Sequence, residues 1–371
     1  MVLCNKALEA SNFDKHNIGK LRSKQNSGSS IRKMRNLLIF LAITAIVTVG
    51  YVFLNAKKQS EHLIYRKTLL NSSVMENVNY IPNPEVSVME ATDNWITTCR
   101  HQEKYRLGNQ LFVFAALYGI AQRNNVTPVL SIDYGERPNT LPKLFAIPLD
   151  IYRVPSNNKT IFKEKSFGIY DNRTETLPKK SHTTCLSGFY QSWKYFKSYE
   201  RDLRTRLTLL PRVRTKAMNY VQSLIPKRDS YVNYTYVGIH VRHGDIARTP
   251  VLIKGGYQAA PVSYFKKAVK FFARKFQNVR FIVSGDDPKW NKKHIRGKHM
   301  YYTDIEDPLQ DFAIQSVMNH TIMSVGTYGW WAAWIANGTT LYYKHPFRTN
   351  STLFRNFKNT DHFPPHWIPM D

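Results

Sequence analysis

The residues best placed to do chemistry are a histidine, an arginine and an aspartate at the end of an apolar run. Residues 236–245 read Tyr-Val-Gly-Ile-His-Val-Arg-His-Gly-Asp, so a segment suited to a buried strand leads directly into His240, Arg242 and Asp245. Strands of this kind end at the carboxyl edge of a parallel sheet, where open α/β folds bind ligands. A guanidinium there holds a phosphate through two parallel hydrogen bonds. The alternative is a strand with a solvated polar end.

Two neighbouring carboxylates follow a second apolar run, residues 279–284. Asp286 and Asp287 are the kind of pair that binds Mg²⁺ or Mn²⁺ between phosphates. Because the basic site can do the same electrostatic work, we expect a site without a metal. Asp287 also has a structural alternative, the cap of a helix that begins at Pro288, since proline suits the first helical position.

A third segment combines a strand, a tight turn and a helix start. The run 320–325 ends in Gly326-Thr327 and is followed by the aromatic stretch 328–335. Free N–H groups and the helix dipole at such a start attract a phosphate, and Thr327 would cap the helix or contact that phosphate. Asp311 lies in an otherwise apolar helix nearby in the sequence. The tryptophans of the stretch are predicted to be core residues, with a sugar-binding platform as the alternative.

The fourth segment is the turn Gly108-Asn109-Gln110, which precedes a stretch, 111–123, that is apolar nearly all round. Such a stretch predicts a buried helix. The glycine permits close backbone approach, and Asn109 offers amide hydrogen bonds.

The elements that carry these residues alternate along the chain. Strands are predicted over 236–242, 279–284, 300–303, 320–325 and 339–344, and helices over 261–276, 307–318 and 328–336. This alternation predicts an α/β fold with a parallel sheet covered on both faces. Together with a strand over 128–132 and a helical pattern over 195–225 that Pro211 interrupts, it gives an N-terminal α/β domain (96–230), a Rossmann-like domain (231–350) and a C-terminal segment (351–371).

The chain before residue 96 is organised differently. Residues 1–36 form a basic tail, residues 37–54 are uncharged and apolar, and residues 55–95 are polar, as in a stem. The apolar segment is near the lower limit for crossing a bilayer and lies too far from the N-terminus for an ordinary signal peptide. Its basic flank favours a cytosolic N-terminus and a translocated C-terminal domain. The alternative for this segment is a buried core helix.

The charge balance, 53 Lys and Arg against 26 Asp and Glu, attracts nucleic acid, membrane surfaces or phosphorylated substrates. A luminal location argues against nucleic acid as a partner. It also leaves Cys99 and Cys185 in an oxidising compartment, available for one disulfide, with Cys4 on the other side of the membrane. The sequon at Asn319 sits inside an apolar pattern that suggests burial. The N-glycosylation candidates are Asn71, Asn125, Asn158, Asn172, Asn233 and Asn350.

Taken together, the four segments resemble the α-1,2-fucosyltransferase family, glycosyltransferase family 11. The matching motifs are Gly-Asn-Gln-Leu-Phe from 108, His-Val-Arg-His-Gly-Asp from 240, Ser-Gly-Asp-Asp from 284 and Thr-Tyr-Gly-Trp-Trp-Ala-Ala-Trp from 327. The resemblance implies a GT-B fold of two Rossmann-like domains, in a single-pass type II enzyme of the Golgi membrane with a luminal catalytic domain. It further implies GDP-fucose as donor, a glycan with a terminal galactose as acceptor, and no metal or other cofactor.

The resemblance also assigns roles within the donor site. Arg242 matches the arginine that holds the diphosphate, and Thr327 matches a phosphate-contacting hydroxyl. His240 and Asp311 match nucleotide contacts. The full set of donor-site residues is Asn109, His240, Arg242, Asp286, Asp287, Asp311 and Thr327.

The expected reaction is an inverting transfer in which an acceptor hydroxyl attacks as GDP leaves. Asp245 is the candidate base, and its alternative role is to orient Arg242 through a salt bridge. His243 stands where the family has a second arginine, so a permanent charge is missing. The alternatives are another fucosyl linkage, such as O- or α-1,6-transfer, and a catalytically inactive luminal sugar-binding protein.

Overall fold

The computed structural model describes residues 94–99, 106–131, 140–147, 151–152, 159–177, 183–226 and 233–371. These residues belong to one compact unit, Ser87–Asp371. The predicted tail (1–36), membrane segment (37–54) and nearly all of the stem (55–95) lie outside them, as does Cys4. Within the described part of the chain, no helix has the length and apolar character needed to cross a bilayer.

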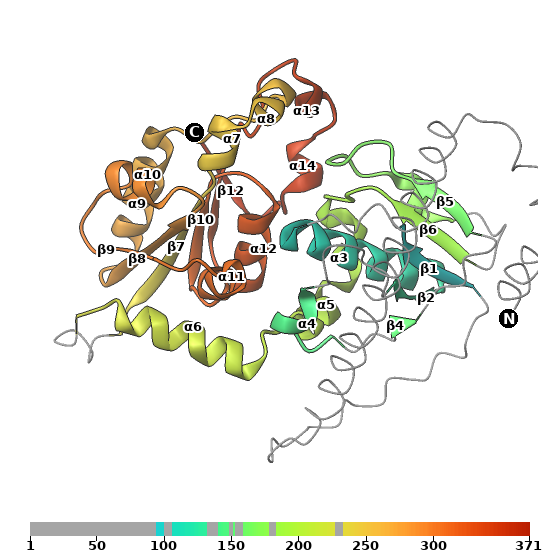
Figure 1. The fold of residues 1–371 in the computed structure, drawn as a ribbon, viewed down its shortest axis with the longest axis horizontal. Helices are drawn as coiled ribbons and strands as arrows, with labels where there is room; N and C mark the ends of the chain where they lie inside the picture. Colours follow the sequence, from blue (N-terminus) through green and yellow to red (C-terminus); the bar gives the residue numbers. More distant parts are fainter. Residues whose placement is uncertain are drawn as a thin grey trace, which may run out of the picture. The chain divides into compact units, whose positions relative to one another are not determined.

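The N-terminal half is built on a four-stranded parallel sheet in the order β2-β1-β6-β5. Its principal helix, α3 (Leu107–Asn124), is buried along most of its length, as its apolar sequence predicts. Figure 1 shows α3 between this sheet and helix α12 (Thr327–Ala336). The strands are β1 (Trp95–Thr98), β2 (Thr127–Pro128), β5 (Lys159–Lys163) and β6 (Thr183–Ser187); β3 (Leu130–Ser131) pairs with β4 (Ile151–Tyr152) separately.

The C-terminal half is a six-stranded parallel sheet in the order β12-β11-β10-β7-β8-β9. Counted along the chain from β7, this is the strand order of a Rossmann fold, with a switch point between β7 and β10. The prediction of an α/β fold with parallel sheets is therefore confirmed. The strands are β7 (Thr235–Val241), β8 (Val279–Gly285), β9 (Met300–Tyr302), β10 (His320–Met323), β11 (Thr340–Tyr343) and β12 (Ile368–Met370).

Helices cover both faces of this sheet. Helix α9 (Val262–Lys275) packs on one face with Tyr264 and Phe272 fully buried, and α11 (Pro308–Ser316) and α12 pack on the other. Trp330 and Trp331 of α12 are 0% exposed, which confirms the prediction that they are core residues. Shorter helices follow the strand ends: α7 (Gly244–Arg248), α8 (Pro250–Gly255) and α10 (Pro288–His294).

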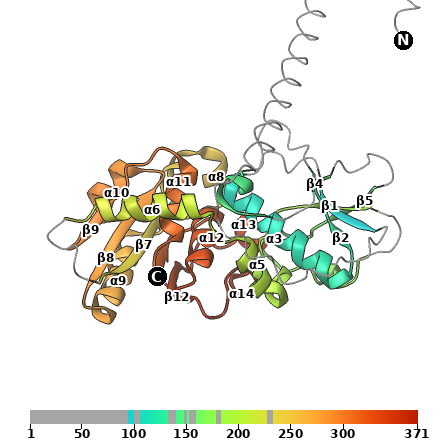
Figure 2. The ribbon, with the colours of Figure 1, turned by 90° about the horizontal axis from the view of Figure 1, so that it is seen from below.

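The chain passes from the N-terminal half to the C-terminal half through two helices. Pro211 does not merely interrupt a helix but begins a new one, α6 (Pro211–Ser223), after α5 (Glu200–Arg206). Helix α6 packs against α11 of the C-terminal half, as both views show (Figures 1 and 2). A proline at the first helical position has no N–H to lose and a suitable backbone angle, so the helix starts there.

The segment after residue 350 is part of both halves and not an appendage. Helices α13 (Thr352–Arg355) and α14 (Asn359–His362) lead to β12, which pairs with β11. On the way, Asp361 forms a 2.6 Å ion pair with Lys194 of the N-terminal half. The sequence conceals this because β12 contains a proline and is short; as an edge strand it tolerates that residue.

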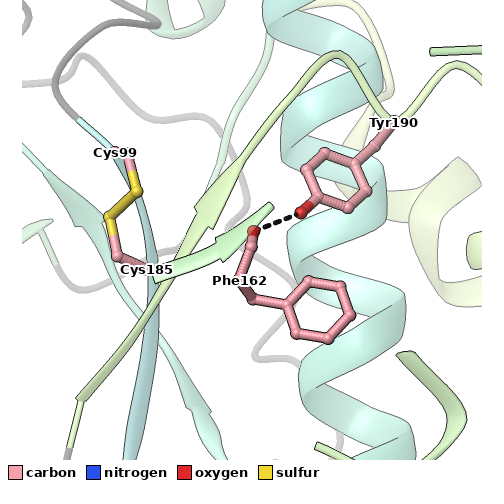
Figure 3. The surroundings of a disulfide bond; sticks show 4 residues. All are labelled: Cys99, Phe162, Cys185 and Tyr190. Atoms are coloured by element: carbon pink, nitrogen blue, oxygen red, sulfur yellow. Dashed lines mark hydrogen bonds between the residues drawn. A yellow bond between two sulfur atoms is a disulfide. The ribbon is translucent and has the colours of Figure 1, made fainter. Parts of the chain in front are cut away.

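Cys99, which follows β1, is joined to Cys185 of the neighbouring strand β6 by a disulfide (Figure 3). The sequon residues Asn125, Asn172, Asn233 and Asn350 are exposed, whereas Asn71 and Asn158 lie outside the described residues. The expectation of burial for Asn319 was wrong: the residue is exposed at the start of β10. Its side chain accepts a hydrogen bond from the backbone of Tyr236 at 2.8 Å.

Candidate functional site

Arg242 lies immediately after β7 and is held in a fixed orientation. Its Nε and Nη2 donate to the two oxygens of Asp245, each at 2.9 Å, and its guanidinium lies over the ring of Tyr257 at 4.9 Å. Only 18% of the Arg242 side chain is exposed. Burial alone would lower the pKa of Arg242, but the hydrogen-bonded carboxylate of Asp245 outweighs it and the pKa is raised. The site therefore contains a preoriented, permanent positive charge.

Asp245 is shared between two arginines. Besides Arg242, it accepts a hydrogen bond at 3.3 Å from Arg106, which directly precedes α3. Burial raises the pKa of Asp245, but the hydrogen bonds and charges of the two arginines lower it to about 2. Such a carboxylate is a weak proton acceptor, so its contacts favour the alternative role of orienting Arg242. Arg106 was missed in the sequence; its only signal is its place just before the Gly108-Asn109 turn.

Asp286 fixes the loop that follows Arg242. Its Oδ1 accepts hydrogen bonds from the backbone N–H groups of His243 (2.7 Å) and Gly244 (2.9 Å), and its Oδ2 accepts one from Asp245 (2.9 Å). The carboxylate thus satisfies free N–H groups at the start of the short helix α7. Asp286 therefore holds in place the loop that follows Arg242.

Asp287 caps α10, the alternative that its sequence context offered. Its Oδ1 accepts from the backbone N–H of Trp290 at 3.1 Å, and its Oδ2 forms a 3.0 Å ion pair with Arg248. His243 stacks on Trp290 with ring centroids 4.1 Å apart, and its Nδ1 is 3.4 Å from Asp287. The residue in the place of the family's second arginine is therefore packed against α10.

The start of α12 lies at the switch point between β7 and β10, beside Arg242. Gly326 precedes the helix with φ 94°, a left-handed conformation that favours glycine. A Cβ on Gly326 would lie 2.8 Å from Nη1 of Arg242, so the guanidinium lies directly against this turn. No side chain caps the helix and no acidic residue lies in its first turn. Its dipole and free N–H groups are thus available to an anion.

The start of α3 meets the start of α12. The hydroxyl of Thr327 donates to Oδ1 of Asn109 at 2.9 Å, and Gln191 Nε2 donates to the same oxygen at 3.1 Å. A Cβ on Gly108 would lie 2.6 Å from the backbone carbon of Thr327, so only glycine permits this approach. Helix α3 also lacks a side-chain cap and acidic residues in its first turn. The starts of two helices and Arg242 therefore lie together, an arrangement that could bind an anion.

A second group of polar side chains lies beside this site. His240 is buried against Tyr328, with ring centroids 5.1 Å apart, and burial lowers its pKa to about 4. Its Nδ1 is buried without a hydrogen-bond partner among the described residues. Asp311 accepts hydrogen bonds from Thr303 (3.1 Å) and Tyr328 (3.2 Å), and burial raises its pKa. A neutral imidazole and a buried carboxyl are suited to a heterocycle with N–H groups.

The structure thus gathers the residues singled out in the sequence at one edge of the six-stranded sheet. Asn109, Arg242 and Thr327 lie together and form a candidate anion site, while Asp286 and Asp287 bind groups of the protein itself. Gln191 was missed because nothing in its sequence neighbourhood distinguishes it. Within the described part of the chain, no cluster of three His, Cys, Asp or Glu side chains has the arrangement of a metal site. Metal independence stays a prediction.

Comparisons with known proteins identify the family of the chain. The profile described as Glycosyl transferase family 11 matches residues 63–371. Galactoside alpha-(1,2)-fucosyltransferase 1 of Leontocebus fuscicollis is 29% identical over 277 residues, 72% of this chain and 73% of that protein. Galactoside alpha-(1,2)-fucosyltransferase 2 of Sus scrofa is 29% identical over 273 residues, 72% of this chain and 78% of its own length.

Among solved structures, the alpha-1,6-fucosyltransferase NodZ soaked with GDP-fucose aligns with a TM-score of 0.45 at 14% identity. The alignment covers 68% of this chain and 96% of NodZ. The family profile covers most of the chain, including every residue of the site. The chain therefore belongs to glycosyl transferase family 11 and is a fucosyltransferase.

Proposed function

We propose that this enzyme transfers L-fucose from GDP-fucose to the 2-hydroxyl of a terminal galactose, with inversion at the sugar carbon. The names of the family relatives support the acceptor sugar and the linkage. The donor is supported by the chemistry of the site, in which a fixed cation and a group of heterocycle-binding side chains lie next to each other. The same proposal places the catalytic domain in the Golgi lumen, anchored by residues 37–54.

One observation carries the proposal: the guanidinium of Arg242, oriented by Asp245, lies against the uncapped start of α12. As the bond between fucose and GDP breaks, negative charge grows on the diphosphate. Each helix start carries about half a positive charge, and the guanidinium adds a full one. These groups are in place before the reaction, so stabilising the leaving group requires no reorganisation of the protein.

The nucleotide fits the polar group beside the anion site. The carboxyl of Asp311 would accept hydrogen bonds from N–H groups of guanine. The acceptor hydroxyl attacks the sugar from the face opposite the diphosphate. Both oxygens of Asp245 already accept hydrogen bonds from Arg242, so this carboxylate contributes by holding the arginine, and the proton of the attacking hydroxyl passes to water as the new bond forms.

The disulfide between Cys99 and Cys185 supports a luminal domain, since such bonds persist in oxidising compartments. The exposed sequons at Asn125, Asn172, Asn233 and Asn350 fit the same address. Treating the protein from secretory cells with an N-glycanase tests this point. An unchanged electrophoretic mobility would argue against a luminal domain.

The function is tested by incubating the full-length protein in detergent with radiolabelled GDP-fucose and a panel of glycans. The panel contains terminal galactose, terminal N-acetylglucosamine, and galactose whose 2-hydroxyl is replaced by hydrogen. We expect label only on the intact galactose glycan, in a linkage that an α-1,2-fucosidase cleaves. Transfer to the deoxy acceptor would refute the linkage, and the absence of both GDP binding and transfer would refute the proposed activity.

A further inference from the structure

The loop between β6 and the helical turn at Trp193–Tyr195 contains a residue with an unfavourable backbone conformation. Tyr190 has φ 50° although it is an aromatic residue, and it is 0% exposed. Left-handed backbone at such a residue is unfavourable and persists only where surrounding contacts enforce it, often at functional sites. The contacts of this loop therefore indicate what the strained conformation positions.

The first part of the loop is fixed by Glu164, the residue after β5. Its carboxylate accepts hydrogen bonds from the backbone N–H groups of Phe189 and Tyr190, the latter at 2.7 Å. The hydroxyl of Tyr190 donates to the carbonyl of Phe162 at 2.9 Å (Figure 3). The backbone at Tyr190 is thus held from both its main chain and its side chain.

The second part of the loop fixes Gln191. Its backbone N–H donates to the carbonyl of Phe167 at 2.9 Å, and its carbonyl accepts from Nδ1 of His362 at 2.7 Å. Burial lowers the pKa of His362 to about 4, so the ring is neutral and donates from Nδ1. Both backbone groups of Gln191 are thus hydrogen-bonded, and only 9% of the residue is exposed. Its side chain therefore has little freedom to change direction.

The side chain of Gln191 points to Asn109. Oδ1 of Asn109 accepts from Nε2 of Gln191 and from the hydroxyl of Thr327, which are the only hydrogen-bond partners of this side chain among the described residues. The hydroxyl of Thr327 can donate or accept, so it is Gln191 that distinguishes the two orientations of the Asn109 amide: turning that amide over would bring its NH₂ group against the NH₂ group of Gln191. The Nδ2 group then remains available as a donor at the convergence of α3 and α12.

We infer that Gln191 is a positioning residue of the donor site, which keeps the amide of Asn109 turned so that Nδ2 donates to the diphosphate of the sugar nucleotide. The inference rests on the proposed function, because it takes the anion to be that diphosphate. The strained loop supplies the rigidity: without it, Gln191 would have many rotamers and Asn109 two orientations.

The test is a double-mutant cycle between Gln191→Met and Asn109→Ala, measured in the full-length enzyme. Methionine keeps the length of the side chain but has no N–H group. Loss of one oriented hydrogen bond should raise KM for GDP-fucose about tenfold, with kcat changed less than about threefold. In the Asn109→Ala background, the same change at position 191 should have less than about a twofold effect, since its partner is absent. Equal losses in both backgrounds would overturn the inference.

A control in the same loop separates positioning from folding. Ser192→Ala removes a buried 2.5 Å hydrogen bond to the carbonyl of Asp361 but leaves Asn109 untouched. This variant should lower Tm while KM for GDP-fucose stays unchanged. If Gln191→Met does not fold, Gln191→Glu, which keeps the shape and exchanges the donor for an acceptor, enters the same cycle.

The wild-type enzyme distinguishes the two proposals. A wild-type protein that neither binds GDP nor transfers fucose would refute the proposed function itself. A wild-type enzyme that transfers fucose, together with a Gln191→Met variant of unchanged KM, would refute the positioning role alone.

Discussion

Replacing Arg242 by lysine would keep a positive charge at the end of β7. It would remove the planar guanidinium whose two N–H groups hydrogen-bond to Asp245. Nε and Nη2 each donate to one oxygen of Asp245 at 2.9 Å, while Nη1 lies against Gly326 at the start of α12. A lysine ammonium cannot occupy these positions together. It therefore either pairs with Asp245 or turns toward the diphosphate, and one of the two contacts is lost.

The magnitude follows from that choice. A hydrogen bond between charged groups contributes about 1.5–3 kcal/mol, and this side chain is only 18% exposed, so screening by water is limited. Loss of one such contact, about 2–3 kcal/mol, corresponds to a decrease in kcat/KM of about 30- to 150-fold. Arg242→Ala removes both contacts and leaves the carboxylate of Asp245 facing the diphosphate, so a loss of about 1,000-fold or more is expected.

The assay is steady-state transfer at varied GDP-fucose, with GDP binding measured by calorimetry and folding by thermal unfolding. The matched control is Arg248→Lys, since Arg248 also pairs with an aspartate but is 67% exposed; exposed pairs contribute about 0–1 kcal/mol. Near-normal turnover in Arg242→Ala would refute the reasoning. So would a loss in Arg248→Lys as large as that in Arg242→Lys.

Three further predictions concern packing, the disulfide and pH. In Gly108→Ala, the new Cβ would lie 2.6 Å from the first residue of α12. We expect the free energy of unfolding to fall by about 1–3 kcal/mol and the rate of fucose transfer to fall as well. Gly255→Ala, with its nearest atom at 3.4 Å, is the control and should keep both its stability and its activity. Replacing Cys99 and Cys185 by serine opens a link across 86 residues and should lower the free energy of unfolding by about 4–5 kcal/mol in urea titrations; an unchanged value would contradict a formed bond. Burial lowers the pKa of His362 from 6.5 to about 4, so its contribution to stability is complete above pH 6.5 and is lost as pH falls through 4, by about 3 kcal/mol. The stability of His362→Gln should depend less on pH over that range, and an identical pH dependence would refute this.

The sequence predicted the sheet and its ends well because the signals are local. Apolar runs that stop at polar residues define both the strands and the edge at which they end, so Arg242 and Thr327 could be assigned to one edge without coordinates. Asp287 was also interpretable, since an aspartate before a proline is a common helix start. In each case the deciding neighbours lie within a few residues.

What the sequence could not provide were contacts made by distant segments. Arg106 reaches Asp245 across 139 residues and Gln191 reaches Asn109 across 82. No periodicity or turn signal encodes which loops meet across two sheets. Asp286 is similar, because its three acceptor contacts depend on how a neighbouring strand end folds back.

The chain passes between the two sheets more than once, and this limits how the enzyme moves. After β11 it returns to the N-terminal half through α14, where Asp361 pairs with Lys194 at 2.6 Å, and then reenters the second sheet as β12. The carbonyl of His362 meanwhile accepts a hydrogen bond from Trp330 at 3.0 Å. A wide rotation of one half relative to the other would have to break the contacts that α14 makes with both halves. We therefore expect substrate entry and product release to involve movements of loops and side chains and not a wide rotation of the halves.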